Sequence, residues 1–268
     1  LIWLIEETGM EPFKALVKSQ FDEKYPSRAG NLLDAQPEPW AGTTWEKRDL
    51  LGVHDQKQEG KSFVGVIIPA GRIMPDEARA LADVADKYSN GEIRLTVEQN
   101  LIFPNVANDE VEALLKEPLF NTGKFEIPGN AVDSPLSRGL VSCTGAQFCG
   151  IALIETKNRA VALTKKLEEK LKLPAPVRIH WTGCPNSCGQ AQIADVGLMG
   201  APARIEKEVD GKIKKVAVEG VNIFLGGKVG EDPFLGEVYK KGIPADFEYL
   251  MPVMEEILKE KFGAVSSS

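Results

Sequence analysis

The segments VSCTGAQFCG (141–150) and HWTGCPNSCGQ (180–190) decide the fold, because they hold all four cysteines of the 268-residue chain. The cysteines form a C-x5-C pair and a C-x3-C pair: Cys143 with Cys149, and Cys184 with Cys188. Both segments contain glycines, and the second also contains a proline, so each is predicted to be a tight turn. Four thiols in a chain of this length are too few for a disulfide framework. The open roles are metal ligand, cluster ligand, catalytic thiol and inert core residue.

An iron–sulfur cluster is the favoured interpretation of the two turns. Each iron of a cubane needs one thiolate, so two cysteine pairs can bind it if the turns approach each other in space. Structural zinc also takes four thiolates and is the main alternative, although C-x5-C is longer than its usual C-x2–4-C spacing. Disulfides and unrelated buried thiols also stay open. A helix predicted to begin near Cys149 would direct the positive end of its dipole at an anionic cluster.

The composition predicts a large, soluble protein. Hydrophobic residues make up 43% of the chain, enough for one large domain or two smaller ones. No run of about 18 apolar residues predicts a membrane span, and the first residues lack the features of a secretory signal. A net charge of -7 argues against a nucleic-acid partner. The chain starts at Leu1 within a helical pattern, so a processed or partial product is expected.

Hydrophobic periodicity and turn residues predict alternating strands and helices. Beyond residue 190 we expect an antiparallel sheet with a hairpin turn at Asp210–Gly211. The other expected elements are a helix over 1–25, an extended connector, a strand over 62–68, a helix over 75–89, a strand over 93–103, helices over 108–117 and 150–172, a strand over 177–181 and a closing helix over 245–263.

The two histidines and the glycines carry no further site. His54 and His180 do not form a ligand pair at helical or hairpin spacing, and His180 is interpreted as a packed strand residue. Gly226–Gly227 is typical of a turn after a strand. No G-x-G-x-x-G motif stands between a strand and a helix, so no nicotinamide or flavin site is expected.

The cysteine segments resemble the cluster signature of the sirohaem-containing nitrite and sulfite reductases. The similarity is greatest to the ferredoxin-dependent nitrite reductases of plants, algae and cyanobacteria. RLTVEQNLIFPNV (94–106) resembles a strand motif in the family's ferredoxin-like half-domain, and VNIFLGG (221–227) resembles its C-terminal segment. The resemblance covers essentially the whole chain.

This resemblance implies an α+β protein in which a ferredoxin-like half-domain precedes a mixed α/β sirohaem and iron–sulfur domain. Residues 1–25 would be the last helix of a preceding half that is missing here, and residues 26–55 a connector. Residues 56–130 would form the half-domain and residues 131–268 the sirohaem and 4Fe-4S domain.

The resemblance also implies the site residues. Cys143, Cys149, Cys184 and Cys188 match the four ligands of a 4Fe-4S cluster. Cys188 matches the thiolate that bridges cluster iron and sirohaem iron as the axial ligand. Asn186, Gln99 and Arg94 occupy places from which they could contact the macrocycle or its acidic rim.

The implied activity is the six-electron reduction of nitrite to ammonium by reduced ferredoxin. Nitrite is preferred to sulfite because of Gln147 and Phe148 in the first turn and Ser187 and Gln190 in the second. The alternatives are half of an assimilatory sulfite reductase, an iron–sulfur electron-carrier module and a zinc-stabilised interaction domain.

The same resemblance implies the partners and location. The chain is expected to be inactive without the N-terminal half of the same enzyme. The implied location is the chloroplast stroma, or the cytoplasm of a cyanobacterium, with no membrane attachment. Ferredoxin is acidic whereas the chain is also negative overall, so docking would need a local basic patch, for which Lys228, Lys240 and Lys241 are candidates.

Overall fold

The computed structural model describes residues 2–28, 50–130, 134–209, 211–230 and 232–267. It divides into two compact units, Leu1–Glu46 and Lys47–Ser268. The first unit contains α1 (Ile2–Thr8), α2 (Met10–Lys24) and the 3-10 turn η1 (Pro26–Arg28). The prediction of one helix over 1–25 is therefore wrong at Gly9, whose φ of 86° is incompatible with a continuous α-helix. Most of the predicted connector over 26–55 lies outside the described residues.

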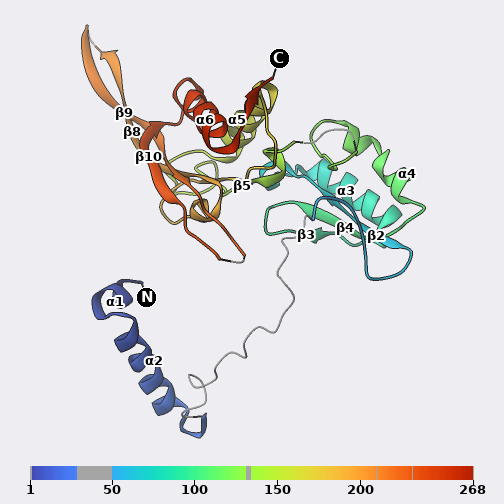
Figure 1. The fold of residues 1–268 in the computed structure, drawn as a ribbon, viewed down its shortest axis with the longest axis horizontal. Helices are drawn as coiled ribbons and strands as arrows, with labels where there is room; N and C mark the ends of the chain where they lie inside the picture. The colour runs from blue at the N-terminus through green and yellow to red at the C-terminus, as the bar shows by residue number, and fades with distance from the viewer. Residues whose placement is uncertain (1, 29–49, 131–133, 210, 231, 268) are drawn as a thin grey trace. The chain divides into compact units, whose positions relative to one another are not determined.

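The second unit begins with a four-stranded antiparallel sheet of order β1-β2-β4-β3. Its elements are β1 (Gly52–Asp55), β2 (Lys61–Val66), the 3-10 turn η2 (Pro69–Gly71), α3 (Pro75–Tyr88), β3 (Arg94–Leu95), β4 (Leu101–Ala107), α4 (Val111–Leu115) and the 3-10 turn η3 (Pro118–Asn121). α3 starts at a proline with Asp76 and Glu77 in its first turn, as predicted, and packs on the sheet (Figure 1). The buried positions of α3 recur at helical spacing: Leu81, Val84, Ala85 and Tyr88.

The single strand predicted over 93–103 is instead a β-hairpin. β3 and β4 are joined by a turn in which the Gln99 N–H donates to the Thr96 carbonyl over 3.1 Å. Gln99 has a φ of 62°, a conformation that no regular strand contains. The alternating apolar and polar residues suggested one strand, but the chain reverses at this residue.

A second sheet, of five strands, follows with the order β10-β9-β8-β7-β5. β5, β7 and β8 run parallel, whereas β8, β9 and β10 are antiparallel. β8 and β9 form the predicted hairpin, paired as far as Val209 and Lys212, and it extends beyond the rest of the sheet (Figure 1). The strands are β5 (Leu140–Ser142), β7 (Ile179–Thr182), β8 (Val196–Val209), β9 (Lys212–Leu225) and β10 (Glu237–Pro244), with the 3-10 turns η4 (Ser137–Gly139) and η5 (Ala191–Ile193).

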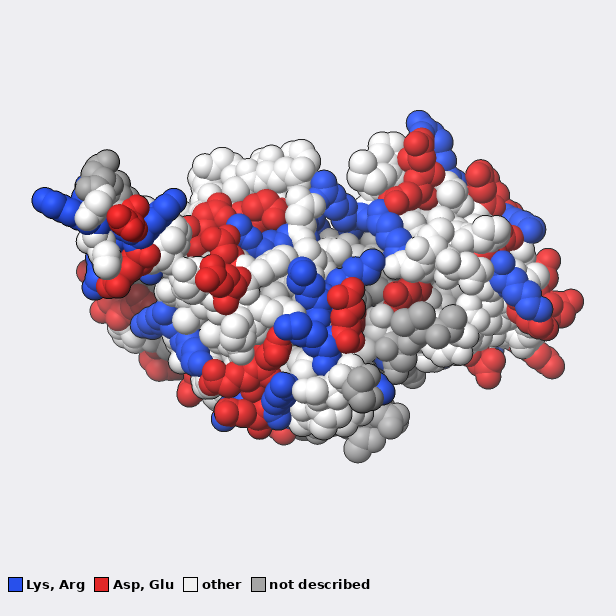
Figure 2. All heavy atoms as spheres, turned by 90° about the horizontal axis from the view of Figure 1, so that it is seen from above, with Lys and Arg blue, Asp and Glu red and all other residues white. Residues whose placement is uncertain are grey.

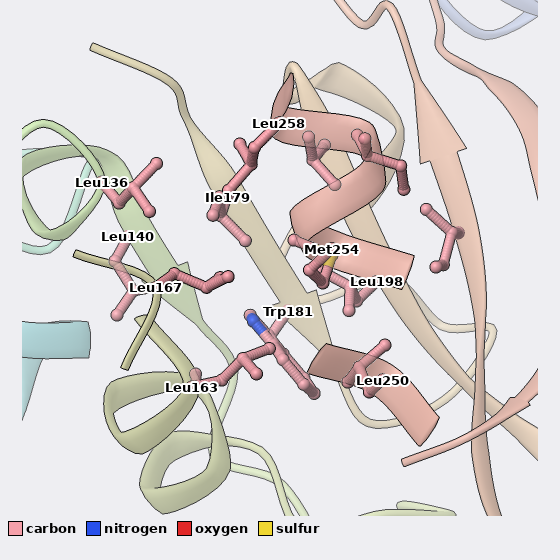
Figure 3. Packing of buried hydrophobic residues seen from close by; sticks show 14 of the residues in the cluster. Leu136, Leu140, Leu163, Leu167, Ile179, Trp181, Leu198, Leu250, Met254 and Leu258 are labelled. Carbon is pink, nitrogen blue, oxygen red and sulfur yellow. The ribbon is translucent and has the colours of Figure 1, made fainter. Parts of the chain in front are cut away.

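Two helices, α5 (Lys157–Lys170) and α6 (Phe247–Phe262), pack with this second sheet. A two-stranded sheet of β6 (Leu171–Lys172) and β11 (Val265–Ser266) lies after their ends. Trp181 of β7 is fully buried and lies between side chains of α5, such as Leu163, and side chains of α6, such as Leu250 (Figure 3). This core is separate from the one under α3 and β4.

The α+β class predicted from the sequence is confirmed. Among the described residues, no helix combines the length and the apolar character that a membrane crossing requires.

Replacing Trp181 with alanine is expected to lower the free energy of unfolding by about 3–5 kcal/mol, because it removes a fully buried indole and leaves a cavity. Trp181→Phe should cost less, since the indole nitrogen is buried and has no partner among the described residues. Val97→Ala is the control, because Val97 is 94% exposed. Denaturant unfolding of the three variants measures the differences; equal costs for Trp181→Ala and Val97→Ala would contradict the assigned core.

Candidate metal centre

The two cysteine turns emerge at the same edge of the second sheet. β5 and β7 are parallel neighbours, with Ser142 opposite Trp181. Cys143 follows β5 directly, and Cys184 lies two residues beyond the end of β7. Because parallel strands end at a common edge, both cysteine pairs start from adjacent positions. The structure thus brings together the two turns that the sequence places 40 residues apart.

Hydrogen bonds hold the first turn against the second. The Cys143 N–H donates to the Trp181 carbonyl over 3.0 Å, and the Leu153 N–H donates to the Gly183 carbonyl over 2.7 Å. The Gly183 N–H donates to the Cys143 sulfur over 3.1 Å. A sulfur of the first turn therefore already accepts a backbone hydrogen bond from the second.

Two glycines allow this close approach. A Cβ atom on Gly189 would lie 2.0 Å from the Trp181 carbonyl oxygen, so no side chain fits there. Gly145 has a φ of 68°, and a Cβ atom on it would lie 2.3 Å from the Thr156 hydroxyl. A side chain at either Gly145 or Gly189 would therefore clash with its neighbours.

The four thiols differ in exposure. Cys184 is buried, Cys143 and Cys149 are partly buried, and Cys188 is exposed. No three His, Cys, Asp or Glu side chains in the described ranges are grouped closely enough to hold a single metal ion. Four thiols on two neighbouring turns, with an N–H already donating to one sulfur, fit an iron–sulfur cluster, whose sulfurs accept such bonds.

The sequence predicted that a helix begins near Cys149. In the structure α5 begins later in the chain, and its first turn lies against Cys143. α5 begins at Lys157, and the Thr156 hydroxyl before it donates to the Cys143 carbonyl over 2.7 Å. The same hydroxyl lies 3.9 Å from the Cys143 sulfur. The predicted first turns of the helix are absent because the backbone there bonds across the turns instead; the Ala146 N–H donates to the Ile154 carbonyl over 2.9 Å.

Gln99 holds the strand that leads to the first cysteine. Its amide nitrogen donates to the Ser142 carbonyl over 2.9 Å, and its amide oxygen accepts the Ser142 N–H over 3.0 Å. Ser142 is fully buried and directly precedes Cys143. Both polar atoms of Gln99, a predicted cofactor contact, are therefore engaged in positioning β5.

Asn100 makes a second bridge that the sequence analysis did not identify. Its side-chain oxygen accepts the Ile68 N–H over 2.9 Å, and its side-chain nitrogen donates to the Arg138 carbonyl over 3.1 Å. A polar residue immediately before a buried strand was the available signal. Asn100 is 3% exposed, so these bonds satisfy an otherwise costly buried amide.

The two other predicted contact residues lie at the surface. Arg94 of β3 is exposed and forms an ion pair with Glu92, with 2.6 Å between nitrogen and oxygen. Asn186 is exposed in the second turn, two residues before Cys188.

His180 contacts the chain just after the second cysteine turn. It is 4% exposed, and its Nδ1 lies 3.2 Å from the Gln190 carbonyl oxygen, so Nδ1 carries the proton. Nε2 is buried and has no partner among the described residues. Burial lowers the pKa of His180 to about 4, and the Arg178 charge adds to this effect, although the Gln190 carbonyl opposes it. His180 is thus a neutral packed residue, as predicted.

Two family descriptions match the chain. Residues 54–121 match "Nitrite/Sulfite reductase ferredoxin-like half domain", and residues 134–259 match "Nitrite and sulphite reductase 4Fe-4S domain". The second match contains all four cysteines.

The relatives that match this chain are longer than it is. The ferredoxin–nitrite reductase of Zea mays chloroplasts is 48% identical over 265 residues, which are 99% of this chain and 43% of the maize protein. The ferredoxin–nitrite reductase of Synechococcus elongatus is 48% identical over 268 residues, or 47% of its length. Among solved structures, the Mycobacterium tuberculosis NirA protein matches 96% of this chain and 43% of its own, with a TM-score of 0.70 and 26% identity. The chain spans less than half the length of these relatives.

Gln99→Leu is expected to lower the free energy of unfolding by about 2–4 kcal/mol, because it leaves the buried N–H and carbonyl of Ser142 unpaired. Gln99→Asn is the matched variant: asparagine tolerates a positive φ but is one methylene too short for both bonds. A similar loss in both variants, measured by denaturant unfolding, would assign the cost to the lost bonds. An unchanged free energy of unfolding in Gln99→Leu would contradict the stabilising role of the two Gln99–Ser142 hydrogen bonds.

His180 should make the protein less stable as the pH falls from about 6.5 towards 4. Its folded-state pKa is depressed, so the unfolded chain binds a proton first, and the stability present above pH 6.5 is progressively lost. The full effect is about 3 kcal/mol. Unfolding free energies measured at pH 7 and 4.5 should therefore differ less in His180→Asn, which can still donate to the Gln190 carbonyl. Identical pH dependence in both proteins would refute this assignment.

Proposed function

Because the chain belongs to the family of nitrite and sulfite reductases, we propose that it is the C-terminal part of a ferredoxin-dependent enzyme that reduces nitrite to ammonium. The reaction consumes one nitrite, six electrons and eight protons, and yields one ammonium ion and two waters. The relatives at 48% identity are named ferredoxin–nitrite reductases. Since the chain spans less than half of their length, the activity is assigned to the longer protein.

The observation that carries the proposal is the meeting of the two cysteine turns at the ends of β5 and β7. Cys143, Cys149, Cys184 and Cys188 would hold a 4Fe-4S cluster. When bound, the cluster and a sirohaem supply one-electron transfer from a donor and a metal site for the anion. Cys188 would be the thiolate shared by both groups, because it is the most exposed of the four cysteines.

The other predicted residues receive different roles. Gln99 is a positioning residue, because its amide is already bonded to Ser142. Asn186 is exposed beside the proposed bridging thiolate and would face the macrocycle. Arg94 would contact the acidic rim of the macrocycle if its guanidinium group left Glu92 and paired with a carboxylate of the sirohaem instead.

Nitrite is preferred to sulfite for this chain. The relatives at about 48% identity are named for nitrite, so a sulfite reductase half and an electron-carrier module are not favoured. Within the turns, Phe148 is 77% exposed and Gln190 is also exposed, so both are available to shape the surroundings of the anion.

Reduced ferredoxin is the proposed electron donor, and the N-terminal half of the enzyme is the proposed covering partner. On the face shown in Figure 2, basic side chains are interspersed with acidic ones. Of the three docking candidates, Lys240 is engaged with Glu256 at 3.0 Å, which leaves Lys228 and Lys241 as the better ones. Chloroplast and cyanobacterial relatives support a plastid or a cyanobacterial cytoplasm as the location.

Metal analysis of the full-length enzyme, purified without air, tests the proposal. We expect iron and acid-labile sulfide with a chlorin-type visible spectrum, and nitrite-dependent oxidation of reduced ferredoxin. Cys188→Ser should lose the sirohaem spectrum and nitrite reduction together, because the shared thiolate is removed. Thr144→Ser, in an exposed position of the first turn, is the control and should retain both. Zinc without sulfide, or a Cys188→Ser enzyme with normal activity, would reject the proposed site.

A further inference from the structure

The first turn of α5 is fixed against Cys143. The Thr156 hydroxyl donates to the Cys143 carbonyl over 2.7 Å and lies 3.9 Å from the Cys143 sulfur. The Gly183 N–H donates to the same sulfur over 3.1 Å. The backbone at the first position of α5 therefore has a defined place relative to this sulfur.

That first position is Lys157. Its side chain is partly buried, and its ammonium group donates to the carbonyl of Ala70, a fully buried residue of η2. A lysine with a fixed ammonium group is unusual, because the flexible stem normally carries the charge into water. The ferredoxin-like half-domain thus holds this charge beside the other domain's cysteine turn.

No described acidic side chain forms an ion pair with Lys157. Glu155, the nearest acid in the sequence, accepts the N–H groups of Asn158 and Arg159 over 3.0 and 3.2 Å. Arg72 bonds to the Asn158 amide and adds a second cation at this helix end. Burial lowers the pKa of Lys157. The Thr156 hydroxyl contacts the Cys143 sulfur, and the next residue along the chain, Lys157, has its ammonium group fixed at the Ala70 carbonyl, so the charge is held in the neighbourhood of this turn.

No acidic side chain that lines the neighbouring cavity forms an ion pair with Lys157 in the part of the chain that the structure describes. Lys157 lines a cavity of about 500 Å³ between η2 and α5. Lys124 at its wall is paired with Glu77, and Glu168 accepts three hydrogen bonds from Leu136 and Ser137. Glu126 is the remaining acid of the wall, and it has no ion pair with Lys157.

We propose that the ammonium group of Lys157 raises the reduction potential of the centre held at Cys143. Reduction adds one negative charge to the cluster, and a partly desolvated cation at close range stabilises that charge more than the oxidised form. Lys157 is an electrostatic residue that sets how readily the centre accepts an electron from its donor. This inference rests on the proposed cluster.

The test is a redox titration of the full-length holoenzyme, followed by the electron paramagnetic resonance signal of the reduced cluster. Lys157→Met keeps the length of the stem and removes the charge. We expect it to lower the ratio of reduced to oxidised cluster at a fixed potential by about tenfold, which is a shift of about 59 mV for one electron. Lys157→Arg keeps the charge and should remain near the original potential.

Lys165→Met is the matched control, because Lys165 lies two turns further along α5, lines the same cavity and is exposed. Its potential should be unchanged. An unchanged potential in Lys157→Met, or an equal shift in Lys157→Arg, would overturn the proposal. If the methionine variant assembles no cluster, Lys157→Gln is titrated in its place: a lowered potential supports the proposal and an unchanged one overturns it. Absence of iron and sulfide from the unaltered enzyme would instead reject the proposed function.

Discussion

The parallel pairing of β5 with β7 is the constraint on which the rest of the structure depends. The pairing covers only three residues of β5, with Ser142 opposite Trp181, and both cysteine turns start where it ends. A slip by one residue would turn every side chain of a strand to the other face. Trp181 would then leave the core, where it is fully buried, and His180 would enter it. The core therefore fixes the register, and the register fixes the place of the thiols.

A three-residue strand at the end of a sheet has unpaired backbone groups on its outer side. Here the ferredoxin-like half-domain supplies the missing partner through side-chain amides. Gln99 bonds both backbone groups of Ser142, and Asn100 bonds the carbonyl of Arg138. After the reversal of the chain at Gln99, the Gln99 amide bonds to β5 and the Asn100 amide bonds to η4, the 3-10 turn that precedes β5. The half-domain is thus structurally coupled to the cysteine turns as well as adjacent to them.

The sequence predicts those parts of the fold in which local pattern and tertiary packing agree. α3 has its proline start, acidic first turn and apolar face within fifteen residues, and the β8–β9 hairpin has its turn and alternation. The reversal at Gln99 is not predictable in this way, because its bonding partner Ser142 lies 43 residues away. The late start of α5 has the same cause, since Gly183 bonds the backbone that would otherwise continue the helix.

The candidate site also has parts that the local sequence predicts and parts that depend on tertiary contacts. The cysteines are identifiable because thiol chemistry and spacing are local properties, and the approach of the two pairs follows once β5 and β7 are parallel. The surroundings of the Cys143 sulfur depend on Thr156 and Gly183, which contact it only through the tertiary fold. No local pattern identifies a lysine whose charge is fixed by a carbonyl 87 residues earlier in the chain.

Exposed apolar side chains lie on the first cysteine turn and on the β3–β4 hairpin, and they bear on how strongly the Lys157 charge would act. Phe148 and Ile151 of the first turn are 77% and 65% exposed, and Leu95 and Val97 of the β3–β4 hairpin are 81% and 94% exposed. Side chains of this kind suit the covering by the N-terminal half proposed above, and the longer relatives have more than half of their length beyond this chain. Covering the turns would exclude water and lower the local dielectric constant, which strengthens every charge interaction inside. The apolar cover would then strengthen the effect of the fixed ammonium group, because a cation influences an electron acceptor strongly only where water does not screen it.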